Sequence, residues 1–115
     1  WPEELRLQEQ GCLLKVVFNS GETHFLNAEY LRVESPSAEV QGHGPDQKVC
    51  VGGKMGVLII KVEPVGNYAV RLTFDDMHST GIYSWNYLAQ LGREYDTIWP
   101  AYLERLESEG KSRDR

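Results

Sequence analysis

The chain has 115 residues and a formal net charge of −5, with 41% hydrophobic and 25% charged residues. This length and balance are typical of one soluble globular domain. No run approaches the ~18 apolar residues of a membrane-spanning helix, so we expect no contact with a membrane. The acidic balance and the lack of a basic stripe argue against nucleic acid as a partner.

The two cysteines, Cys12 and Cys50, form no paired motif. Small secreted domains that depend on disulfides usually have more cysteines. We therefore expect free thiols and a cytoplasmic location. Cys12 lies in an apolar run and is predicted to be a small core residue.

The opening of the chain predicts a three-stranded antiparallel meander. Apolar and polar residues alternate in the way that half-buried strands require. The expected strands cover residues 4–8, 12–18 and 23–26. Residues 19–21 (Asn-Ser-Gly) favour a hairpin turn because Asn and Gly tolerate positive φ. Asn27 is then a suitable N-cap for a short helix over residues 28–33.

The regular pattern stops between residues 34 and 56, where two prolines and five glycines occur. A loop this long in a compact domain is often functional or mobile. Residues 48–51 are expected to form a short strand within it. Beyond the loop, residues 57–62 and 68–74 are strand-like and flank a Pro-Val-Gly-Asn turn, which predicts a second hairpin.

After Gly81 the apolar residues recur every three or four positions, which predicts helix with Ser84 as the N-cap. Pro100 lacks the N–H group that a helix interior uses. Residues 84–109 therefore form either one helix kinked at Pro100 or two helices, the second capped by Asp96 or Thr97.

Glycines mark the expected ends of these helices, because glycine readily adopts the left-handed conformation that follows a helix. Gly92 is the candidate end of the first helix and Gly110 that of the second. The basic residues Lys111, Arg113 and Arg115 lie beyond, in a tail expected to be solvated and frayed.

Together these elements predict an α+β fold. It consists of an antiparallel β meander, a second β-hairpin, and C-terminal helices packed on the sheet. Residues 1–92 are expected to form the domain, and residues 93–115 a C-terminal helix and a disordered tail.

Asp75, Asp76 and His78 place two carboxylates and an imidazole within four residues. One hypothesis is a metal site, in which Asp76 and His78 share a face of a strand and His43 or Cys50 supplies a further ligand. The other is a structural junction, where Asp side chains bind free backbone N–H groups and His78 holds the turn. We favour the junction.

Other catalytic signatures are missing from the sequence. Gly52-Gly53-Lys54 has neither the glycine spacing nor the following Ser or Thr of a phosphate-binding loop. There is no nucleophile-elbow motif. A pair between Cys50 and His43 has nothing in the sequence to orient it. We therefore expect no enzymatic activity.

Aromatic residues concentrate in one C-terminal segment. Tyr83, Trp85, Tyr87 and Trp99 are either core residues with hydroxyls at its rim or an exposed surface for docking a partner protein, since Trp and Tyr anchor interfaces. The sequence leaves both alternatives open.

Two long segments carry a family resemblance: AEYLRVESPSAEVQGHG (28–44) and VEPVGNYAVRLTFDDMHSTGIYSW (62–85). With the strand-rich opening, they resemble the gamma-butyrobetaine hydroxylase-like N-terminal domain family over residues 3–92. The resemblance implies a small stand-alone bacterial protein of unknown function. In the oxygenase members, this domain precedes the catalytic barrel and is not itself the catalyst.

The resemblance also implies a lost zinc site. In the oxygenase members, three cysteines and one histidine bind a structural zinc, and the corresponding positions here are Ser35, Ser37, Val40 and His78. Hydroxyls are poor zinc ligands beside thiolates, and valine cannot ligate at all. We therefore expect a fold without a cofactor, in which Ser35, Ser37 and His78 approach one another.

The expected function is that of a non-enzymatic accessory module that docks to another protein through residues 34–56 and 83–99. A related domain ends some plastid iron–sulfur carrier proteins, so the resemblance implies partners in iron–sulfur assembly or among oxygenases. The alternative is a zinc- or iron-binding protein, or a partner in iron–sulfur assembly, that uses Asp76 and His78.

Overall fold

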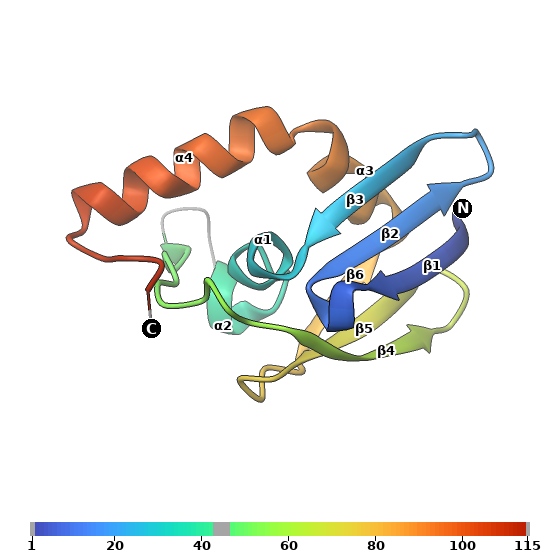
Figure 1. Ribbon diagram of the computed structural model, residues 1–115, viewed down its shortest axis with the longest axis horizontal. Helices are drawn as coiled ribbons and strands as arrows, with labels where there is room; N and C mark the ends of the chain where they lie inside the picture. Colours follow the sequence, from blue (N-terminus) through green and yellow to red (C-terminus); the bar gives the residue numbers. More distant parts are fainter. Residues whose placement is uncertain (1, 43–46, 115) are drawn as a thin grey trace.

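The computed structural model in Figure 1 describes residues 2–42 and 47–114. One antiparallel sheet has the order β1-β2-β3 and a second has the order β4-β5-β6. The strands are β1 (Pro2–Gln8), β2 (Leu13–Phe18), β3 (Thr23–Asn27), β4 (Ile59–Val65), β5 (Ala69–Phe74) and β6 (Gly81–Ser84). The helices are a 3-10 turn (Glu9–Gly11), α1 (Ala28–Val33), α2 (Ala38–Gln41), α3 (Trp85–Arg93) and α4 (Tyr95–Ser108). The predicted α+β class is confirmed.

Both sheets contribute one face to a single core. Alternate residues of β2, such as Leu14 and Val16, are completely buried, and Leu72 and Phe74 of β5 are buried in the same cluster. Leu88 of α3 joins them. Each such side chain contributes about 1.5–3 kcal/mol when it is removed from water. The burial of alternate strand side chains is therefore a large part of the driving force for folding.

The short helix α1 begins as the sequence predicts. The Asn27 side chain accepts a hydrogen bond from the Tyr30 N–H at 2.8 Å, which is N-cap geometry. Glu29 lies in the first turn, is 6% exposed, and pairs with Arg113 from the far end of the chain.

The helix expected with Ser84 as its N-cap is present as α3, but the strand that precedes it was not predicted. Residues Gly81–Ser84 form β6, which pairs with β5 so that Gly81 lies opposite Leu72 and Tyr83 opposite Val70. A four-residue strand offers too few alternations to be distinguished from the helical stripe that follows it. Ser84 still caps α3, because its side chain accepts a hydrogen bond from the Tyr87 N–H at 3.1 Å.

The C-terminal stripe forms two helices rather than one kinked helix. Glu94 separates α3 from α4 and is the N-cap residue of α4, although its side chain makes no capping bond. Asp96 and Thr97 lie inside α4, so neither of them is the cap. Pro100 lies inside α4, where its missing N–H removes one intrahelical bond.

Gly110 ends α4 as expected. Its φ is +68°, and its N–H bonds to the Glu107 carbonyl at 3.1 Å while the Lys111 N–H bonds to the Leu106 carbonyl at 2.8 Å. This is the Schellman arrangement, in which glycine is favoured because it has no Cβ.

The predicted frayed tail is wrong as far as residue 114, because the tail packs against the body. The Lys111 ammonium donates to the Cys50 carbonyl at 2.8 Å, and the Ser112 carbonyl accepts the Gly53 N–H at 2.8 Å. The next carbonyl, of Arg113, accepts a further loop N–H at 3.1 Å.

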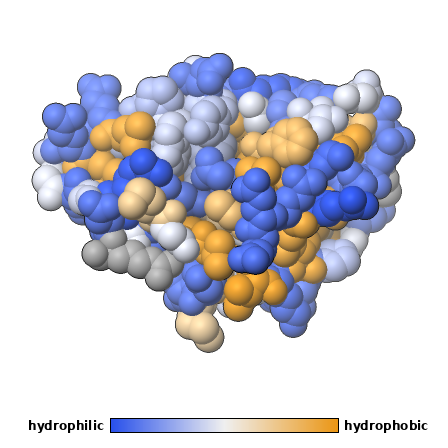
Figure 2. All heavy atoms as spheres, viewed as in Figure 1, coloured by the Kyte–Doolittle hydropathy of each residue, from blue (hydrophilic) through white to orange (hydrophobic). Residues whose placement is uncertain are grey.

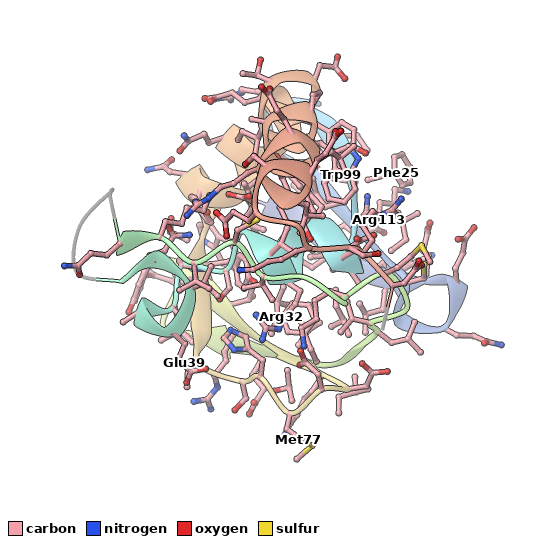
Figure 3. All side chains as sticks on the ribbon, turned by 90° about the vertical axis from the view of Figure 1, so that its left-hand side faces the viewer. Phe25, Arg32, Glu39, Met77, Trp99 and Arg113 are labelled. Carbon is pink, nitrogen blue, oxygen red and sulfur yellow. The ribbon has the colours of Figure 1, made fainter. Side chains whose placement is uncertain are left out.

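Arg113 fastens the tail more strongly than its neighbours do. Its guanidinium makes two hydrogen bonds, of 2.7 and 2.9 Å, with the carboxylate of Glu29. It also lies 5.4 Å from the ring centroid of Trp99 on α4, and Figure 3 shows the two side chains beside each other. Bidentate pairing of arginine with a carboxylate, combined with a cation–π contact, orders a segment whose composition suggested disorder.

Three smaller predictions are also wrong. Cys12 is exposed rather than part of the core, because it falls in the bend before β2. Residues 48–51 form no strand, although the Val49 N–H bonds to the Val40 carbonyl at 2.7 Å. Gly92 lies inside α3 and does not end it.

Over the described part of the chain, no helix is both long enough and apolar enough to cross a membrane.

Gly92 is required by its close approach to His24 on β3, since an added Cβ would overlap the imidazole ring. We expect Gly92→Ala to lower the free energy of unfolding by about 1–3 kcal/mol, the usual cost of overpacking. Urea unfolding of Gly92→Ala, His24→Ala and the double variant measures this cost. In the His24→Ala background the penalty should shrink; strictly additive effects would contradict the proposed overlap.

Candidate functional site

Ser35, Ser37 and His78, which the family resemblance equates with zinc ligands, lie where the loop after α1 meets the turn after β5. His78 is 5% exposed, and its Nε2 is 2.9 Å from the hydroxyl of Ser35. Its Nδ1 is 3.2 Å from the Glu39 carboxylate on α2. The Ser37 hydroxyl is 2.7 Å from the hydroxyl of Thr80. We call these five residues, Ser35, Ser37, Glu39, His78 and Thr80, the clasp.

The hydrogen bonds of the clasp define the protonation state of His78. The carboxylate of Glu39 can only accept, so Nδ1 carries the proton and donates. Burial, followed by the nearby charge of Arg32, lowers the pKa of His78 below its ordinary value of 6.5. The neutral ring therefore accepts at Nε2, and the Ser35 hydroxyl donates to it.

Local structure places each clasp residue. Ser37 is the N-cap of α2, since its hydroxyl accepts the Glu39 N–H at 3.2 Å, and this cap sets Glu39 in the first turn. On the other side, Met77 has φ of +74° at the tip of the turn. Gly81 completes the approach, because a Cβ there would overlap the Ser35 hydroxyl.

Asp76 belongs to a separate ion-pair network. Its carboxylate is 2.8 Å from Nε of Arg32 and 2.6 Å from Nζ of Lys54, and it also accepts the His78 N–H at 3.0 Å. Burial acts to raise the pKa of Asp76, but the hydrogen bonds from Lys54, the His78 N–H and Arg32 outweigh it and lower the pKa to about 2. The carboxylate is therefore ionised and fully engaged.

Arg32 is the least satisfied member of that network. Arg32 is a residue of α1, and its side chain is 12% exposed. Its Nη1 is buried and has no hydrogen-bond partner among the described residues. Such a donor costs free energy, so the attraction between Arg32 and Asp76 must offset it.

The connection from Ser35 through His78 to Glu39 has the order of a nucleophile, a base and an orienting acid. Ser35 is completely buried, however, and its hydroxyl also accepts the Ser37 N–H at 3.2 Å. A substrate has no path to that hydroxyl in this structure. The arrangement holds two segments together and does not present a nucleophile.

The residues at the positions that the family resemblance assigns to zinc do not fit zinc. The Nε2 lone pair of His78 is used by Ser35, two of the other positions offer neutral hydroxyls, and Val40 is a 1% exposed core residue. A tetrahedral structural site needs thiolate or imidazole donors at these points. Here they form hydrogen bonds and apolar contacts instead.

The alternative metal set is not brought together. Cys50 lies in a second apolar cluster with Val33, Tyr102 and Leu106, and Asp76 is bound by two cations. His43 lies outside the described residues. Within residues 2–42 and 47–114, no group of three or more His, Cys, Asp or Glu side chains is placed to hold a metal ion.

The four aromatic residues do not form one exposed docking surface. Tyr83 is 0% exposed, so its predicted role in docking is wrong. Trp85, Tyr87 and Trp99 are half-buried and pack against the core. Hydrophobic residues on the face in Figure 2 are interrupted by hydrophilic ones, and Met77, the most exposed at 81%, projects from the turn in Figure 3.

Tyrosine hydroxyls instead serve as internal ties, a role that sequence reasoning missed. Each donates to a main-chain carbonyl far along the sequence: Tyr30 to Leu91, Tyr83 to Leu31, Tyr87 to Glu34 and Tyr102 to Val51. Burial raises the pKa of all four hydroxyls, so they stay protonated as donors. The only sequence signal was the number of tyrosines in apolar stripes.

A half-open cavity of about 420 Å³ lies between α3, α4 and the segment after residue 47. Its floor is apolar, and charged groups stand around it. Its lining includes Glu34, Lys48, Cys50, Tyr87, Leu91, Glu94, Thr97, Ile98, Ala101, Tyr102 and Arg105. We call this cavity the α4 groove.

His78 makes the stability of the fold depend on pH. Because its folded pKa is below 6.5, its contribution is fully present above that pH and is lost as the pH falls through 6.5 towards the folded value. We expect the free energy of unfolding to decrease between about pH 7.5 and pH 5.5. His78→Gln should flatten this slope in urea titrations, whereas parallel pH profiles for the two proteins would contradict the assignment.

The comparisons with known proteins agree with the fold. Two NMR solution structures are 45% identical to the chain: one covers 98% of this chain and 89% of its own with a TM-score of 0.83, the other 97% and 83% with 0.84. The third is a crystal structure of a protein of unknown function from Acidithiobacillus ferrooxidans, which belongs to the DUF971 family and is 40% identical to this chain. The match covers 79% of this chain and 91% of that protein's chain, with a TM-score of 0.65. No curated protein matches the chain.

The family model described as gamma-butyrobetaine hydroxylase-like, N-terminal, matches residues 5–89. This range contains the second half of β1, all of β2 to β6, the clasp and the first part of α3. The chain belongs to the gamma-butyrobetaine hydroxylase-like N-terminal domain family.

Proposed function

We propose that this protein is a non-enzymatic interaction module that binds another protein through the α4 groove. The observation that carries the proposal is the position of the groove. It is lined by residues of both segments that the sequence analysis predicts to bind a partner, 34–56 and 83–99. Hydrophobic grooves are a recurring type of site at which proteins bind segments of other proteins.

The state of the polar clusters supports a non-enzymatic role. Catalytic acids, bases and nucleophiles have to reach a substrate. Ser35 and His78 are buried, and Asp76 is bound by Arg32 and Lys54. The Ser35 hydroxyl, the His78 ring and the Asp76 carboxylate are all engaged in contacts within the protein.

Only one of the four aromatic residues predicted to dock a partner lies at the α4 groove. This residue is Tyr87, which lines the groove together with the neighbouring Leu91 and Ile98. The free cysteines Cys12 and Cys50 suit a reducing compartment such as the cytoplasm. Proteins of iron–sulfur assembly and oxygenases are the first candidate partners, on the strength of the family resemblance.

The test is chemical-shift mapping on the full ¹⁵N-labelled chain, titrated with partners that co-purify from the native cell. We expect amide shifts to concentrate in residues 47–51 and 87–105. Met77 and Phe25, which are exposed and distant in sequence from the groove, serve as internal controls. Shifts confined to β1 or to the turn around Met77 would contradict the proposed surface.

A further inference from the structure

We propose that the α4 groove receives a short basic amphipathic helix from the partner protein. This inference rests on the proposed function, since it names the chemistry of the segment that the groove binds. The helix would place apolar side chains on the floor of the groove and a Lys or Arg beside Glu94.

The shape of the groove follows one face of α4. The residues of that helix region that line it are Glu94, Thr97, Ile98, Ala101, Tyr102 and Arg105. Their spacing of three and four residues is the spacing of a single helix face. From residue 94 to residue 105 a helix rises about 16 Å. Arg105 closes one end of the groove through its hydrogen bond to the Lys48 carbonyl, so the open part follows α4 from residue 94 to residue 101, about two turns, and can receive the apolar face of a short second helix.

The wall opposite α4 is held in place before any partner binds. Arg105 donates to the Lys48 carbonyl at 2.6 Å, and Lys111 donates to the Cys50 carbonyl at 2.8 Å. The Val49 N–H is bound by the Val40 carbonyl. Because these bonds fix the main chain, little conformational entropy remains to be lost on binding.

The floor of the groove calls for apolar side chains. Leu91 and Tyr102 are buried there, and Ile98 is half-buried. Burial raises the pKa of the Cys50 thiol, so it stays neutral at the same wall.

The charges around the groove favour a cationic segment. Lys48 is paired with Glu34 and Arg105 with Glu109, so the two cations at the groove are already neutralised. Glu94 forms no ion pair with any residue in the described part of the chain, and it is exposed. The net charge of −5 also attracts a basic partner over longer distances.

The test uses a phage-displayed library of random 16-residue peptides selected on the full chain. We expect enriched peptides to carry apolar residues at helical spacing, together with a net positive charge. Ala101→Trp fills the groove and should weaken their binding at least tenfold. Leu103→Trp is the matched control, since Leu103 is exposed on the same helix outside the groove, and it should leave binding unchanged. Amide spectra of both variants check that they fold.

A charge test separates the cationic contact from shape. Glu94→Gln should weaken the selected peptides about two- to fivefold at low salt, the scale of an exposed ion pair. Glu107→Gln, an exposed acid on the same helix outside the groove, should have no effect.

Each failure has a distinct meaning. Enriched peptides that are acidic, that lack the apolar stripe, or that still bind the Ala101→Trp variant overturn the basic-helix inference and leave an interaction module. Enrichment of no peptide at any surface of the chain overturns both the inference and the proposed function.

Discussion

The fold is organised around one buried hydrogen-bonded imidazole. His78 donates to Glu39 on one side and accepts from Ser35 on the other, and so joins the start of α2 to the turn that leads from β5 into β6. The same segment is also held by the Ser37–Thr80 hydrogen bond and by the Tyr87 hydroxyl, which donates to the Glu34 carbonyl. The groove depends on the same path, because Val40 in α2 binds the wall of the groove through Val49.

The magnitudes show what the clasp can and cannot do. A net hydrogen bond contributes about 0.5–1.5 kcal/mol, whereas a structural zinc contributes about 10–16 kcal/mol of binding free energy in zinc-finger peptides. The clasp therefore cannot replace the energy of a metal. The clasp joins the start of α2 to the turn after β5, and the apolar core shared by the two sheets supplies more of the stability. Bonds that reach far along the sequence, such as Glu29 with Arg113, add to that core from its edge.

Local chemistry explains why parts of the fold could be predicted from the sequence. The hairpins follow from alternation and turn residues, and the caps at Asn27 and Ser84 follow from the hydrogen bonds that their side chains can accept. The contact between Ser35 and His78, expected from the family resemblance, is present at 2.9 Å. In each case the deciding information lies within a few residues or in a motif.

What could not be predicted depends on long-range contacts. β6 is a strand because β5 lies beside it, and four residues carry too little period to show this. The tail is ordered because Glu29 and Trp99, distant in sequence, meet Arg113. The sequence could not show that Tyr83 is buried, because the carbonyl that its hydroxyl binds, that of Leu31, is 52 residues away. No local pattern contains these pairings.

The most direct test of a clasp that needs no ion is the free energy of unfolding of the full chain. It should be measured by urea titration on one metal-stripped sample, first in EDTA and then with equimolar zinc. We predict the same midpoint and slope in both conditions, since no thiolate donors remain and His78 is already occupied. A midpoint that rises on addition of zinc, or a chain that is unfolded in EDTA, would contradict this account.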